Sequence, residues 1–233
     1  MEVLNEHQKK FYEDNGYLVL PAHLSQQVIN DAHAEITRLS AHAATITESD
    51  DLIDLETSHT REDPRIRRIK RPDLQGEFFN TLMRSDAILG PARDLIGPNL
   101  RMHTTKLNMK KAEYGAPVQW HQDVGFYPHT NDDVLAIGVV FDDIAMENGP
   151  LQVFPGSHKG PILDHHSDGI FAGSVDLDKA GLKLEDAVAL TGPAGTITIH
   201  HGRILHGSAL NTSPRDRQML FYEMLAADAF PIA

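Results

Sequence analysis

The sequence predicts a mainly β protein with an N-terminal helical layer, an α+β arrangement whose β core is an antiparallel sandwich or jelly roll. Two observations support this fold class. Apolar residues at helical spacing dominate residues 1–99, and short β-like runs broken by Gly and Pro turns dominate residues 100–233. Because 233 residues fall within the range of single β domains, we expect one domain over 1–233.

The N-terminal helices are predicted from apolar spacing and from their end signals. Asn15-Gly16 is a typical helix end, Ser25 and Ser85 are good N-caps, and Gly97-Pro98 closes the last helix. Residues 43–60 are polar and predict a loop. We therefore expect helices over 4–14, from Ser25 onward, over 74–83 and over 86–96, with a short buried strand over 17–20.

The C-terminal half contains the expected strands. Asn148-Gly149-Pro150 and Pro155-Gly156 are typical turns on either side of one of them. Lys106 and Asn108 alternate with Leu107, so the polar side chains lie either inside the barrel or on the solvent side of an edge strand. We expect strands over 101–110, 118–123, 134–141, 151–154, 194–200 and 217–224.

Composition narrows the function classes. The formal charge of −12 argues against nucleic acid as the main partner, because phosphate binding needs a basic face. No apolar run approaches the length of a membrane span, and the N-terminus lacks the features of a signal peptide. The absence of cysteine excludes disulfides and thiolate ligands and fits a cytoplasmic protein, so a metal site must use His, Asp and Glu.

Two H-x-D motifs are present, and only the first lies in a predicted strand. His121 and Asp123 stand two apart, so an imidazole and a carboxylate share one strand face and form two thirds of a 2-His-1-carboxylate metal site. The second motif, His166-Ser167-Asp168, falls in a polar turn-like stretch without a strand pattern, and we do not expect it to bind metal. A third ligand must come from a distant strand.

His206 is favoured as that ligand over His200 and His201. Adjacent histidines on a strand point to opposite faces, so only one of the latter pair could reach the metal. Arg217 follows His206 by eleven residues at the start of another β-run. An arginine on a rigid strand inside a barrel is best explained by bidentate binding of a carboxylate.

The chain resembles the phytanoyl-CoA dioxygenase family, which are Fe(II)- and 2-oxoglutarate-dependent oxygenases on a double-stranded β-helix, a cupin-like jelly roll. The resemblance extends from about Phe11 to Leu225. It rests on the motifs Trp120-His121-Gln122-Asp123, Asn148-Gly149-Pro150-Leu151, Pro155-Gly156-Ser157-His158-Lys159, His206-Gly207-Ser208, Asn211 and Arg217.

The resemblance implies a role for each matched residue. His121, Asp123 and His206 would hold Fe(II). Arg217, assisted by Ser208, would bind the distal carboxylate of 2-oxoglutarate, and Asn108 would contact the other end of this cosubstrate. The implied reaction uses O2, releases succinate and CO2, and hydroxylates or otherwise oxidises a small organic substrate. The presence of Asp123 favours hydroxylation over halogenation, because halogenating relatives have a small residue there.

The sequence does not identify the substrate. Six Arg and Lys residues crowd into 61–71, either as a solvated face paired with the preceding acidic loop or as a basic wall for an anionic substrate. Lys106, Arg67 and, more weakly, Phe126 are the substrate-facing candidates.

Two other function classes stay open. One is a cupin-like metal isomerase or epimerase, which would have no use for Arg217, and the other is a jelly roll that binds metal without catalysis. We expect a monomer or homodimer that acts on a small molecule, with neither nucleic acid nor membrane as a partner.

Overall fold

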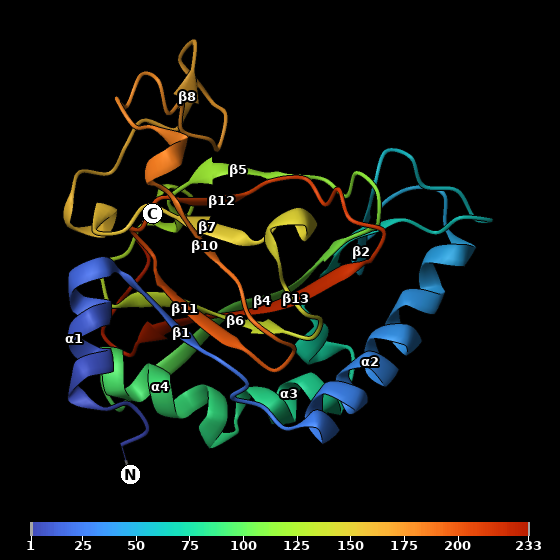
Figure 1. The fold of residues 1–233 in the computed structure, drawn as a ribbon, viewed down its shortest axis with the longest axis horizontal. Coiled ribbons are helices and arrows are strands. Elements are labelled where there is room, and N and C mark those ends of the chain that lie inside the picture. Colours follow the sequence, from blue (N-terminus) through green and yellow to red (C-terminus); the bar gives the residue numbers. More distant parts are fainter. Residues whose placement is uncertain (1, 233) are drawn as a thin grey trace.

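The computed structural model describes residues 2–232 and places two antiparallel sheets against each other as a jelly roll (Figure 1). The larger sheet has the strand order β1-β11-β6-β13-β4-β3-β2, and the smaller has the order β10-β7-β12-β5. The larger sheet comprises β1 (Tyr17–Leu20), β2 (Ile53–Leu55), β3 (Ile66–Lys70), β4 (Leu100–Lys110), β6 (Val134–Val140), β11 (Ile197–His201) and β13 (Arg217–Ala226). The smaller comprises β5 (Val118–His121), β7 (Leu151–Val153), β10 (Val188–Leu190) and β12 (His206–Ser208).

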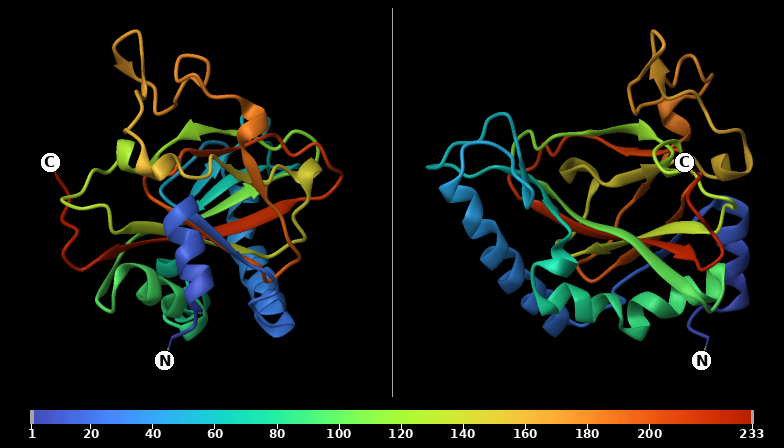
Figure 2. Two further views of the ribbon diagram at one scale, coloured as in Figure 1. Left: turned by 60° about the vertical axis from the view of Figure 1, so that its left-hand side comes forward. Right: turned by 180° about the vertical axis from the view of Figure 1, so that it is seen from behind.

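Helices cover the outer face of the larger sheet. In Figure 1 and in the right-hand view of Figure 2, α2, α3 and α4 lie on the side of this sheet that faces away from β5 and β12, and α1 stands at one end of the sandwich. Their bounds are α1 (Glu6–Asn15), α2 (Gln26–Ser40), α3 (Glu77–Met83) and α4 (Asp86–Ile96). The predicted helical layer is therefore confirmed.

The central strands of the larger sheet are buried on both faces. One apolar core lies between this sheet and the helices, and a second lies between the two sheets. On β13, Leu220 and Tyr222 pack with the helices, whereas Met219 and Phe221 pack between the sheets with Leu151 of β7. This alternation follows from the two-residue period of a strand. It also places Arg217 and Glu223, which have the parity of Met219 and Phe221, on the inner face of the sandwich. The polar side chains of β13 thus point toward the space between the sheets.

Local end signals fix most helix boundaries. Gly16 ends α1 in the left-handed conformation at φ 78°, and the Ser25 hydroxyl accepts a hydrogen bond from the Val28 amide at the start of α2. Gly149 and Gly156 also have positive φ, which confirms the two predicted turns around β7. Ser85 precedes α4 as predicted, but its hydroxyl donates to the Leu82 carbonyl instead of capping the helix.

The loop prediction for residues 43–60 was wrong in part, and no strand was predicted within the basic cluster 61–71. The two segments contain β2 and β3, and β3 pairs with β4 so that Arg68 lies opposite Asn108. The strand signal is masked because three of the five residues of β3 are Arg or Lys, while Ile66 and Ile69 supply its buried contacts. The first 99 residues therefore add three strands to the larger sheet as well as the helices.

The second H-x-D motif forms part of a small hairpin, β8 (His166–Ser167) with β9 (Ile170–Phe171), where no strand was predicted. This segment projects from the side of the smaller sheet in all views (Figure 1 and Figure 2). Among residues 2–232, no helix is long and apolar enough to cross a lipid bilayer.

Candidate metal and cosubstrate site

Three predicted ligands converge between the sheets. His121 ends β5, Asp123 begins the 3-10 turn that follows, and His206 begins β12, where it pairs directly with His121. Their potential ligand atoms all lie within 4.8 Å of one another, and no other such group of three occurs in the described part of the chain. Asp123 Oδ1 lies 3.6 Å from His121 Nε2 and 3.8 Å from His206 Nε2.

Both histidines are oriented by backbone carbonyls. The His121 Nδ1 lies 2.7 Å from the Gln119 carbonyl oxygen, and the His206 Nδ1 lies 3.0 Å from that of Ile204. An Nδ1–H that donates to a carbonyl leaves the Nε2 lone pair free for a metal. Burial, and then the nearby His121, hold the pKa of His206 well below its usual value, so its ring is neutral and able to coordinate.

His200 is a third histidine partner of Asp123 and was considered in the sequence only as a rival ligand. It is buried on β11, and its Nε2 lies 3.5 Å from Asp123 Oδ2, whereas the two ligand histidines lie nearest to Oδ1. Burial favours protonation of Asp123, but His206, His121 and His200 more than offset it and hold the pKa of this carboxyl well below its usual range. His200 therefore positions a carboxylate that remains ionised.

His201 points elsewhere, as expected for the neighbour of His200 on a strand. Its ring packs near Tyr12 and His158, outside the ligand cluster. His166 of the second H-x-D motif is exposed, and its Nδ1 lies 2.8 Å from Asp164. The His158 Nε2 lies 3.1 Å from the Glu13 carbonyl oxygen, so it joins α1 to the turn after β7.

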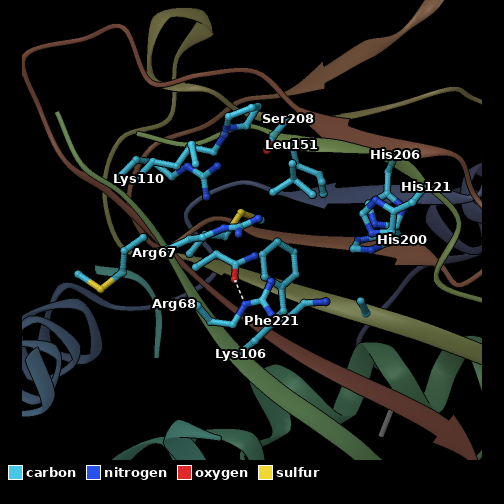
Figure 3. A pocket seen from close by; sticks show the side chains of 18 residues that line it. Arg67, Arg68, Lys106, Lys110, His121, Leu151, His200, His206, Ser208 and Phe221 are labelled. Carbon is cyan, nitrogen blue, oxygen red and sulfur yellow. Dashed lines mark hydrogen bonds between the residues drawn. The ribbon is translucent and has the colours of Figure 1, made fainter. Parts of the chain in front are cut away.

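A cavity leads from the histidines to a buried arginine. Figure 3 shows His121, His200 and His206 together at one end of this cavity, with Lys110 and Ser208 toward the other. Arg217 lines the same cavity, is 3% exposed, and donates from Nη2 to the Gly149 carbonyl at 2.6 Å. Its Nε has no hydrogen-bond partner among the described residues.

Arg217 remains charged in this environment. Burial lowers its pKa to about 10, which is still well above neutral pH. A buried cation with a free N–H directed by a rigid strand is suited to an anionic ligand. Ser208 and Asn108 line the same cavity, and Asn108 Oδ1 accepts a hydrogen bond from Arg68 Nε at 3.1 Å. The structure therefore brings the predicted cosubstrate residues into one cavity.

Lys110 lies beside Arg217 and was not singled out in the sequence. It is 3% exposed and stands directly opposite Arg217 in the β4–β13 ladder. Burial, and then the positive charge of Arg217, lower the pKa of Lys110 to about 7. The alternation that predicted Lys106 and Asn108 on one face extends to Lys110, so the signal was present in the sequence.

A wider cleft of about 1060 Å³ adjoins this cavity at the ligand cluster and shares part of its lining. Lys106, Arg67 and Phe126 line it, together with His121 and Asp123. β4 lies between β13 and β3, so the alternative that Lys106 faces solvent from an edge strand is wrong. Phe126 is half exposed and meets the His121 ring edge-on, with the ring centroids 5.5 Å apart.

The basic cluster fits both interpretations in part. Lys70 pairs with Asp54 at 2.7 Å and Arg71 with Asp73 at 3.2 Å, as expected for charges matched by nearby acids. Arg67 has no acidic partner within 4.0 Å in the described chain, and it lines both the cavity and the cleft. The segment therefore supplies cleft wall as well as paired surface charge.

The donor set fits iron. Two imidazoles and one carboxylate on one side of a site are the ligands used by non-haem Fe(II) oxygenases, and they leave positions open for other ligands. The buried cations at the far end of the cavity fit a cosubstrate with a distal carboxylate.

Comparison with known proteins agrees with this geometry. The family model for phytanoyl-CoA dioxygenase (PhyH) matches residues 12–219. A protein of Stutzerimonas stutzeri named "Probable alpha-ketoglutarate-dependent hypophosphite dioxygenase" is 35% identical over 97% of this chain and 80% of its own length. An L-proline trans-4-hydroxylase of Streptomyces griseoviridis is 36% identical over 62% of this chain and 61% of its own.

A solved structure shows the same fold with cosubstrate bound. EctD from S. alaskensis, crystallised with 2-oxoglutarate and 5-hydroxyectoine, superposes with a TM-score of 0.81 at 25% identity, over 97% of this chain and 77% of that one. The family match, the ligand triad and this fold lead to one assignment. The chain belongs to the phytanoyl-CoA dioxygenase (PhyH) family of Fe(II)- and 2-oxoglutarate-dependent dioxygenases.

Proposed function

We propose that His121, Asp123 and His206 hold Fe(II), and that Arg217, Ser208 and Asn108 hold 2-oxoglutarate while a small substrate is hydroxylated. The observation that supports this most strongly is that His121 and His206 of the ligand triad line the same cavity as Arg217. When bound, the iron and cosubstrate supply O2 activation, and the overall reaction converts R–H, 2-oxoglutarate and O2 into R–OH, succinate and CO2. The residues of this chain perform the binding and positioning.

Each group in the cavity has a distinct task. Arg217 attracts the distal carboxylate and fixes its position along the cavity. The apolar side chains of Leu151, Met219 and Phe221 line the space between the cation and the triad and exclude water from it. His200 keeps the Asp123 carboxylate oriented. The two named relatives act on small polar molecules, hypophosphite in one and L-proline in the other, which supports a small polar substrate here as well.

The direct test is anaerobic absorbance spectroscopy with Fe(II) and 2-oxoglutarate. We expect a weak visible charge-transfer band that requires both components. Absence of this band in the unmodified protein would contradict the proposal, and the band without succinate formation under air would favour a binding module. Succinate formation also separates an oxygenase from the cupin-like isomerase, because isomerisation consumes no 2-oxoglutarate.

Binding of 2-oxoglutarate should weaken as pH rises through about 7, because of Lys110. A bound carboxylate favours the charged form of this lysine, which is already present below its pKa of about 7. Above that pH a proton must be taken up on binding, which costs up to about tenfold in affinity per pH unit. Arg217 and Arg67 oppose the charge on Lys110, and Glu56 favours it.

Titration of the chelate band between about pH 6 and pH 9 measures this slope. In Lys110→Met the affinity for 2-oxoglutarate at acid pH should be lower than in the unmodified protein. The decrease of affinity with rising pH that is due to Lys110 should be absent. An identical pH profile in both proteins would show that Lys110 does not contact the cosubstrate.

We further infer that the enzyme works in the cytoplasm as a monomer or homodimer. The absence of cysteine supports a reducing compartment. Light scattering on the purified protein tests the oligomeric state.

A further inference from the structure

A second charged pair lies on the cleft side of the ligand triad. Glu223 is on the inner face of β13 and is 1% exposed, and the Lys106 ammonium of β4 lies 2.5 Å from its Oε1. Burial disfavours the charge on Lys106, but Glu223 and Asp123 more than offset it and raise the pKa of the lysine. The side chain of Lys106 is 25% exposed, and it lines both this cleft and the cosubstrate cavity.

Two polar atoms beside this pair lack partners. Glu223 Oε2 and the Tyr127 hydroxyl are buried, and neither has a hydrogen-bond partner in residues 2–232. The Tyr127 hydroxyl carries one O–H donor and lies close to the carboxylates of Asp123 and Glu223. Tyr127 and Glu223 line the same cleft as His121 and Asp123. Unpartnered buried polar atoms facing a cleft are typical of a ligand site.

The available hydrogen-bond donors favour an oxyanion. An ammonium has three N–H donors, and the contact with Glu223 uses one of them. The remaining donors of Lys106, together with the Tyr127 hydroxyl, match the two oxygens of a carboxylate or a phosphorus oxyacid. Arg67 lines the same cleft without an acidic partner within 4.0 Å in the described chain, whereas Arg68 lies 3.8 Å from Asp54, so Arg67 adds positive charge to the cleft wall.

Lys106 also lines the cosubstrate cavity, but it lies apart from the two cosubstrate cations Lys110 and Arg217. Lys106 and Lys110 are four residues apart on β4, which separates their backbones by about 13 Å. Phe221 lies opposite Lys106 across the ladder, whereas Arg217 lies opposite Lys110. Figure 3 likewise shows Lys106 and Lys110 in separate parts of the cavity wall.

We propose that Lys106, positioned by Glu223 and joined by Tyr127, anchors the substrate by an oxyanion group beside the metal ligands. The inference rests on the proposed function and names its substrate class: small molecules carrying a phosphinate or carboxylate group. Glu223 holds the ammonium in place, and Tyr127 donates to the second oxygen. The group to be oxidised is then held next to His121 and Asp123.

The test uses the anaerobic enzyme with Fe(II) and 2-oxoglutarate and follows perturbation of the chelate band by added compounds that carry an oxyanion group. The two probes are hypophosphite, an anion, and L-proline, a zwitterion with a carboxylate, and glycerol is the comparison without an oxyanion group. We expect at least one of the two probes, and not glycerol, to shift the band. In Lys106→Met the probe concentration for half of the shift should rise by about 30-fold or more, while 2-oxoglutarate affinity stays within about threefold. A larger response to hypophosphite than to L-proline identifies a phosphorus oxyacid site, and the reverse order identifies a carboxylate site.

Matched variants separate this role from a structural one. Lys111→Met removes a neighbouring lysine that pairs with Asp216 at 3.0 Å, and it should leave the anion response unchanged. Lys106→Met/Glu223→Gln avoids leaving a buried carboxylate unpaired and should show the same loss as Lys106→Met. Glu223→Gln alone should retain the anion response but form less oxidised product for each succinate released. An unchanged ratio of oxidised product to succinate would show that Glu223 does not position Lys106.

Three outcomes overturn the proposal. The first is that neither hypophosphite nor L-proline shifts the band in the unmodified enzyme. The second is that Lys106→Met responds to them as the unmodified enzyme does. The third is that Lys106→Met loses affinity for 2-oxoglutarate, which would assign this lysine to the cosubstrate. Failure of the proposed function is recognised separately, because the chelate band itself would then be missing before any anion is added.

Discussion

An Asp123→Asn variant is expected to lose Fe(II) affinity by at least about 100-fold, and succinate formation with it. Loss of an outer contact to a metal ligand already costs about 10- to 100-fold, so removal of the anionic ligand itself should cost more. Asn supplies only a neutral oxygen. Its NH2 group would also replace one carboxylate oxygen of Asp123, either Oδ2, which lies near His200, or Oδ1, which lies near His206. Anaerobic Fe(II) titration in the presence of excess 2-oxoglutarate measures the loss.

The second H-x-D motif provides a matched control. Asp168→Asn makes the same chemical change at an exposed position in the β8–β9 hairpin, and Asn tolerates its positive φ of 51°. We expect Asp168→Asn to bind iron and turn over like the unmodified enzyme. Equal losses in the two variants would contradict the assignment of the metal site.

An Arg217→Gln variant is expected to bind 2-oxoglutarate at least about 30-fold more weakly while Fe(II) affinity changes by less than about threefold. Truncation of one partner in a buried charge pair costs about 2–5 kcal/mol, and about 1.4 kcal/mol corresponds to tenfold in affinity. Lys110 would remain as a cation at the same end of the cavity, so binding should weaken without being abolished. Titration of the chelate band with 2-oxoglutarate gives the dissociation constant directly.

Arg215→Gln is the control for this change. Arg215 is two residues away, its side chain is 62% exposed, and it pairs with Glu147 at 3.4 Å. Exposed ion pairs contribute little, so cosubstrate affinity should not change. If iron binding fell as far as cosubstrate binding in Arg217→Gln, the variant would have disturbed the fold and Arg217 would have no specific assignment.

Much of the site was predictable because its signals are local. His121 and Asp123 share a strand face by parity alone, and turns at Gly149 and Gly156 follow from residue type. Arg217 was identified because a charged residue opening an apolar strand needs a ligand. The structure brings all three predicted metal ligands together, as expected.

The charged strand β3 shows where this approach fails. The segment around Arg67 and Arg68 has the composition of a surface, and only its pairing with β4 makes it part of the sheet and the cavity wall. Polar residues that line a site interrupt the apolar alternation by which strands are predicted. The strand was therefore not predicted, because the charged side chains that line the cleft interrupt its apolar pattern.

By itself, the sequence determined the jelly-roll class, the helical layer, the H-x-D pair and the arginine, and it favoured His206 as the third ligand, because these follow from patterns within short segments. Only the tertiary structure decided that His200 orients Asp123, that Lys110 stands beside Arg217, and that Glu223 holds Lys106. These relations depend on strand register and on how the two sheets face each other. Both are set by packing between residues far apart in the chain, which no local pattern encodes.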